Sequence, residues 1–134
     1  MNVDLKEAIV LITSSAEKNS RFGTGFVIHQ ADDAAYVVTC AHVVNDVGPD
    51  AVQVNGQAAE VAAIDEGFDL AVLKVTSAAD LPAALPLSAT AQAGLAFSVA
   101  GFYRPDQKAD QCQQLAGVLE KEDERWSATW KSSV

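Results

Sequence analysis

Two residues that could do acid–base chemistry lie beside apolar runs. His42 lies within "YVVTCAHVVND" (36–46), directly after a β-branched run, and Asp69 lies within "EGFDLAVLKV" (66–75). A histidine in such a place is a packed core residue, a metal ligand or a catalytic base, because its ordinary pKa lies near neutrality. An aspartate at the start of a run is also a common turn residue. Taken singly, each residue is more often structural than catalytic.

The other candidate residues are weaker. His29 lies at the polar end of its apolar run, so we expect it at the surface or in a turn. Cys40 and His42 could form a metal site with Asp69, but their separation of two residues is not one of the usual zinc spacings, and His42 fits the base better. A cysteine nucleophile at Cys40 is also disfavoured, because such a cysteine normally takes its histidine from another part of the fold. We interpret Cys40 as a small buried apolar residue and Cys112 as another or as a surface thiol. We therefore expect no metal ligand and no cofactor.

Short apolar runs separated by turn-rich segments must position these residues. Such runs cover 7–13, 22–30, 35–40, 51–55, 58–64, 70–75, 96–102, 112–121 and 125–131. Their spacing of roughly 8–12 residues, without long helical periods, indicates an antiparallel barrel or sandwich. Pro82, Pro86 and Gly94 interrupt the alanine-rich stretch from 81 to 96, so we interpret it as a connector and not a helix. The fold class is all-β.

Four residues indicate the local conformation of the backbone. Gly23 and Gly25, in the run 22–30, indicate a close approach of another chain segment or a bulge. Asn55-Gly56 predicts a tight turn between two short strands.

Three motifs in chain order resemble a known family. They are "GTGFVI" (23–28), "TCAH" (39–42) and "FDLAVL" (68–73). Together they resemble the N-terminal barrel of the trypsin-like (chymotrypsin-fold) serine proteases, most closely the bacterial HtrA-like branch. The resemblance covers about residues 7 to 104, since "GLAFSVAGFYRP" (94–105) is similar to the entry into the second barrel of that family. It implies a complete six-stranded barrel over 1–87, followed by a linker and the first strands of an incomplete second barrel over 88–134.

The resemblance also implies roles for two residues. His42 matches the general base that takes the proton of the nucleophile and later returns it to the leaving amine. Asp69 matches the carboxylate that fixes the imidazole tautomer and stabilises the imidazolium. The implied activity is peptide-bond hydrolysis by a serine endopeptidase, with a polypeptide as substrate.

The sequence departs from that family at the nucleophile. The family carries its serine in a G-[DN]-S-G-G turn, whereas none of the eight glycines here directly follows a serine. The late serines Ser127, Ser132 and Ser133 lack flanking glycines. We therefore expect a chain without a nucleophile that is inactive by itself. The alternative is a catalytically dead domain that binds proteins or acts as a sensor, and a longer parent chain with or without such a turn would distinguish the two.

An incomplete second barrel has a further consequence. Its strands leave unpaired edges and an exposed apolar face, in which Trp126 and Trp130 would take part. We therefore expect the chain to self-associate or to swap strands.

Charge excludes two classes of partner. The chain carries 18 acidic and 9 basic residues, with a net charge of −9 and no basic stripe, so nucleic acid and anionic membranes are unsuitable partners. Its first residues include acids and lack the basic region of a signal peptide, and no apolar run approaches the roughly 20 residues of a membrane span. The two cysteines do not form a disulfide framework. These features predict a cytoplasmic protein.

Overall fold

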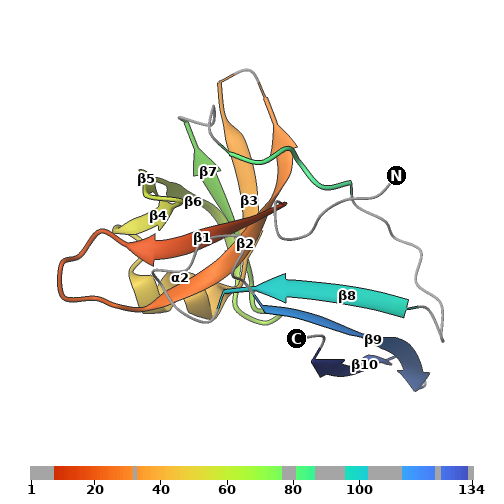
Figure 1. Cartoon of the computed structure of the whole chain (residues 1–134). Coiled ribbons are helices and arrows are strands. Elements are labelled where there is room, and N and C mark those ends of the chain that lie inside the picture. Colours follow the sequence, from red (N-terminus) through yellow and green to blue (C-terminus); the bar gives the residue numbers. More distant parts are fainter. Residues whose placement is uncertain are drawn as a thin grey trace.

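The computed structural model describes the backbone of residues 8–31, 33–76, 81–86, 96–102, 113–122 and 125–132, with side chains described up to residue 102 except for 96–99. Nearly all of these residues lie in strands or in the turns between them (Figure 1). Within this part of the chain, no helix is long and apolar enough to cross a membrane.

Seven antiparallel strands form the first sheet, in the order β5-β4-β1-β2-β3-β7-β6. Their bounds are β1 (Ile9–Ser14), β2 (Phe22–Gln30), β3 (Ala35–Thr39), β4 (Val52–Val54), β5 (Gln57–Ala58), β6 (Glu60–Asp65) and β7 (Leu70–Val75). The two strands at the ends of this order, β5 and β6, are consecutive in the chain and separated only by Ala59. The Ala59 N–H donates to the carbonyl of Val52 at 3.1 Å. The run 57–65 thus pairs with β4 at its start and with β7 along the rest, so the sheet curls round and closes.

This closed sheet confirms the predicted all-β class and the antiparallel barrel. Counting 57–65 as one strand gives six strands, as the resemblance implies, although the predicted run 58–64 is divided at Ala59. The fully buried large side chains fill the interior at alternate positions of the strands, with two more from a helix. They are Val10, Ile12, Val27, Val37, Val44, Val47, Val54, Leu73 and Val75.

The segment between the predicted runs 35–40 and 51–55 is helical, which the sequence did not predict. It forms the helix α2 (Ala41–Val47), which buries Ala41, Val43, Val44 and Val47. Their spacing of three or four residues places one face of the helix on the barrel. Tertiary packing therefore outweighs the preference of β-branched residues for strands. Gly48 ends the helix with φ +95°, and its N–H donates to the carbonyl of Val44 at 2.9 Å.

The glycine predictions are confirmed. A Cβ on Gly23 would lie 2.5 Å from Cγ1 of Val43, so only glycine lets α2 approach β2 this closely. A Cβ on Gly25 would lie 2.8 Å from Cγ1 of Val37. Asn55 and Gly56, with φ of 49° and 82°, form a two-residue turn between β4 and β5.

A second sheet of three antiparallel strands follows, in the order β10-β9-β8. The strands are β8 (Ala96–Gly101), β9 (Gln113–Glu122) and β10 (Arg125–Ser132). Just after β8, the Phe102 N–H donates to Oγ1 of Thr24 in β2 at 2.9 Å and ties this segment to the barrel. The packing of Trp126 and Trp130 lies outside the described side chains, and self-association stays a prediction.

The connector interpretation holds for residues 81–86, which form no helix. The Leu85 N–H in this segment donates to the carbonyl of Val27 at 2.8 Å. The predicted domain boundary between 87 and 88 lies outside the described residues and stays a prediction.

Candidate active site

Asp69 is the last residue of a tight turn between β6 and β7. Its backbone has φ 57°, a left-handed conformation that aspartate tolerates better than most residues. Within the turn, the Phe68 N–H donates to Oδ1 of Asp65 at 3.1 Å. The Asn45 side chain in α2 donates from Nδ2 to Oε1 of Glu66 at 3.1 Å, which ties the turn to the helix. Local turn bonds and a bond to α2 thus fix the backbone that carries Asp69.

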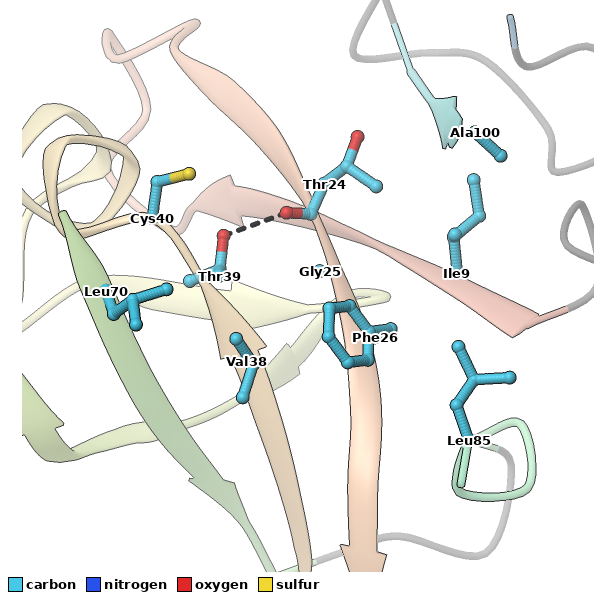
Figure 2. Close-up of a pocket in the computed structure, with 10 residues that line it drawn as sticks. All are labelled: Ile9, Thr24, Gly25, Phe26, Val38, Thr39, Cys40, Leu70, Leu85 and Ala100. Carbon is cyan, nitrogen blue, oxygen red and sulfur yellow. Dashed lines mark hydrogen bonds between the residues drawn. The ribbon is translucent and has the colours of Figure 1, made fainter. Parts of the chain in front are cut away.

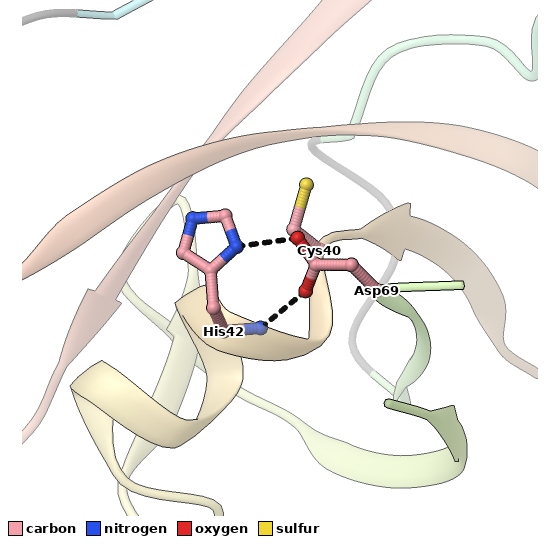
Figure 3. Close-up of side chains that lie close together, drawn as sticks. All are labelled: Cys40, His42 and Asp69. Atoms are coloured by element: carbon pink, nitrogen blue, oxygen red, sulfur yellow. Dashed lines mark hydrogen bonds and ion pairs between the residues drawn. The ribbon is translucent and has the colours of Figure 1, made fainter. Parts of the chain in front are cut away.

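The carboxylate of Asp69 makes two hydrogen bonds to His42 (Figure 3). The backbone N–H of His42 donates to Oδ1 at 2.8 Å, and ring atom Nδ1 lies 2.6 Å from Oδ2. The N-cap residue of α2, Cys40, makes no side-chain capping bond. Asp69 therefore caps the helix from the turn before β7, the strand paired with β3, at a place where the positive end of the helix dipole favours an anion.

This geometry fixes the proton on the imidazole. A carboxylate only accepts hydrogen bonds, so Nδ1 must carry the hydrogen and, in the neutral ring, Nε2 must be the acceptor. Nε2 points away from Asp69 in Figure 3. The side chains of His42 and Asp69 are 64% and 46% exposed, so a reactant can reach Nε2 from solvent.

The same hydrogen bonds hold the pKa of Asp69 below its ordinary value of 3.8. The largest cause is the backbone N–H of His42, followed by the His42 ring, while the Ala41 N–H adds a smaller effect. Asp69 is consequently a carboxylate at neutral pH, which is the form that can orient the histidine.

Cys40 departs from the expectation of full burial, because it is only partly buried at the barrel surface. Burial raises the pKa of its thiol, and the charge of Asp69 raises it further. The thiol form is therefore favoured at neutral pH, which argues against a cysteine nucleophile. One ligand atom each from Cys40, His42 and Asp69 lies within 4.8 Å of the other two.

An apolar cavity of about 390 Å³ lies next to the site, between the outer face of the barrel and β8 (Figure 2). Its lining residues are Ile9, Thr24, Gly25, Phe26, Val38, Thr39, Cys40, Leu70, Leu85 and Ala100. The buried hydroxyl of Thr39 donates to the carbonyl of Thr24 at 2.8 Å, so its polar group is satisfied in the wall. Cys40 belongs both to this wall and to the cluster around Asp69.

Comparison with known proteins identifies the family. Residues 23–134 match the profile of the trypsin-like peptidase domain, and the chain belongs to this family. Among solved structures, the chain is similar to the serine endoprotease from Yersinia pestis, with a TM-score of 0.63 and 24% sequence identity. The match covers 87% of this chain and 42% of that chain, so the protein spans less than half the length of this solved relative. No curated protein matches the chain.

Sequence reasoning found both members of the His42–Asp69 pair, and the fold brings them together. It placed His29 at the surface, where the structure also has it, 5.9 Å from Tyr36 between ring centroids. It missed the bond between Asn45 and Glu66, for which the sequence offers only two polar residues near the motifs. The sequence suggested Cys40, His42 and Asp69 together only as a disfavoured metal site, and the pairing of β3 with β7 brings all three close to one another.

Proposed function

We propose that this chain is the base-bearing part of a serine endopeptidase. The observation that carries the proposal is the pair of hydrogen bonds from His42 to one carboxylate, at 2.8 Å from the backbone N–H and 2.6 Å from Nδ1. Capping of α2 needs only the bond to the backbone N–H of His42, whereas the second bond, to Nδ1, orients the ring as a base requires. Family membership supports the proposal independently.

In the proposed mechanism, Nε2 of His42 removes the hydroxyl proton of a serine as its oxygen attacks the substrate carbonyl. The imidazolium then returns the proton to the leaving amine. Asp69 holds the Nδ1–H tautomer and stabilises the imidazolium by its charge. The serine and the donors for the oxyanion come from polypeptide outside these 134 residues. Without them, the chain alone loses covalent catalysis and oxyanion stabilisation, so we expect it to cleave no peptide bond.

The test uses the longest chain that the gene encodes, treated with a serine-directed fluorophosphonate probe. This probe reports an activated serine whatever the substrate preference. We expect labelling of the long chain, none of the 134-residue chain, and loss of labelling in His42→Ala. Asp69→Asn should slow labelling by about 10⁴-fold, because the amide no longer holds the correct tautomer.

His29→Ala is the matched control, since it removes the other histidine from an exposed position on β2. It should label like the unchanged protein. A folded long chain that fails to label, or that labels equally in His42→Ala, would contradict the proposal and favour a protein-binding module without catalysis.

A further inference from the structure

A thiol, an imidazole and a carboxylate converge at the N-terminus of α2. Cys40 is the N-cap residue of the helix, His42 lies in its first turn, and Asp69 reaches it from the start of β7. One ligand atom from each lies within 4.8 Å of the other two. We propose that Cys40, His42 and Asp69 form a Zn²⁺ site, and that Zn²⁺ and the hydrogen-bonded pair of His42 and Asp69 exclude each other.

The donor set fits zinc, and this proposal reverses the expectation from the sequence, because the third ligand comes from a residue distant in the chain and not from the short spacing of Cys40 and His42. Zn²⁺ is borderline-soft and takes cysteine sulfur, histidine nitrogen and aspartate oxygen as ligands, usually in a tetrahedron. Three protein ligands leave the fourth position for water, as in zinc sites that are open to solvent. Harder ions such as Mg²⁺ and Ca²⁺ prefer oxygen for all of their ligands, and this cluster offers them only one carboxylate. The combination of a sulfur and a nitrogen ligand therefore favours Zn²⁺ over these harder ions.

The geometry is close to what the metal needs. Bonds of about 2.3 Å to sulfur and about 2.0–2.2 Å to nitrogen and oxygen place tetrahedral ligand atoms roughly 3.3–3.6 Å apart. The widest present separation of 4.8 Å must shorten by roughly 1–1.5 Å. Rotation of the three side chains can supply that change. Cys40 and Asp69 are partly buried and His42 is exposed, so an ion can enter from solvent.

Charge favours the ion as well. The carboxylate of Asp69 opposes a second negative charge on Cys40 when no metal is present, yet it attracts a divalent cation to the same place. A coordinating thiol is deprotonated by the metal itself. On binding, the thiol proton goes to solvent, a Zn–S bond forms, and the hydrogen on Nδ1 of His42 moves through solvent to Nε2 so that Nδ1 can bind the metal.

This rearrangement has a consequence for the base. The bond between Nδ1 and Oδ2 at 2.6 Å must open to admit the ion, and Nε2 then carries a hydrogen and no longer accepts a proton. The metal site itself stands on the geometry of this chain. Only the inhibition of peptidase activity by Zn²⁺ rests on the proposed function, so metal binding is measured on the chain without a nucleophilic serine.

The experiment titrates the metal-free 134-residue chain with Co²⁺ and then with Zn²⁺, in a phosphine reductant that leaves the thiols free. Co²⁺ reports a thiolate ligand by a sulfur-to-metal charge-transfer band, and Zn²⁺ should displace it at one ion per chain. Cys40→Ala should abolish the band. His42→Ala and Asp69→Asn should each weaken Zn²⁺ binding by more than roughly 10–100-fold. That range is the usual effect of losing a residue that only hydrogen-bonds a metal ligand, and these two residues bind the metal directly.

Cys112→Ala and His29→Ala are the matched controls, and both should bind like the unchanged chain. Circular dichroism of each variant establishes that it is folded before its affinity is compared. The proposal is overturned if no saturable binding occurs, if Cys40→Ala keeps the charge-transfer band, or if Cys112→Ala alone removes it.

Discussion

At the residue scale, one carboxylate does three things. Asp69 caps α2 through the backbone of His42, orients the ring of His42, and opposes ionisation of Cys40. The sequence could predict that His42 and Asp69 meet, because their motifs resemble those of a known family. It could not predict the capping bond or the position of the thiol, since both depend on the pairing of β3 with β7 and on the helix between them.

The lowered pKa of Asp69 gives a prediction about acid. In the unfolded chain the carboxyl titrates near 3.8, and in the folded chain below it. The hydrogen bonds of Asp69 therefore stabilise the folded chain fully above the unfolded pKa, and this stabilisation is lost as the pH falls through the folded pKa. Carboxyl ¹³C shifts of Asp69, followed against pH in the presence of a chelator, measure the folded value.

We expect that titration to lie below 3.8 in the unchanged chain. His42→Ala should move it part of the way back, because this variant loses the ring donor and keeps the backbone N–H. A midpoint at or above the ordinary value in the folded, unchanged chain would be incompatible with the two bonds.

At the element scale, the site depends on how closely α2 lies against β2. Period-two alternation predicts the strands, because one face of each packs into the barrel. The helix is not predicted by "AHVVNDV", since its valines favour strands. What makes it a helix is non-local: the cap from Asp69, the burial of its valine face, and the space that Gly23 leaves for Val43.

Gly23→Ala tests this contact. The added Cβ would lie 2.5 Å from Cγ1 of Val43, so α2 must shift. We expect a loss of about 1–3 kcal/mol in the free energy of unfolding, the usual effect of overpacking, measured by urea denaturation of the 134-residue chain. Ala63→Ser, at an exposed position of β6, should stay within about 0.5 kcal/mol. Equal stability of Gly23→Ala and the unchanged chain would show that α2 does not depend on this approach.

At the scale of the whole molecule, the first barrel closes upon itself, and a smaller sheet of β8, β9 and β10 follows it. The sequence predicts these strands to within a few residues, apart from the break at Ala59 between β5 and β6, because turn residues separate clear apolar runs. It also predicts the family, which the match over residues 23–134 confirms. The arrangement of the second sheet beside the barrel could not be predicted, since it rests on single contacts such as the bond from Phe102 to Thr24.

The pairing of His42 with Asp69 is tested most directly by ¹⁵N NMR of the imidazole in the metal-free chain, at a pH where the ring is neutral. The two ring nitrogens have distinct shifts with and without a hydrogen. We predict hydrogen on Nδ1 and a free lone pair on Nε2, with this preference lost in Asp69→Asn. A neutral ring with its hydrogen on Nε2, or the same tautomer mixture in both proteins, would contradict the proposed role of His42 as a base positioned by Asp69.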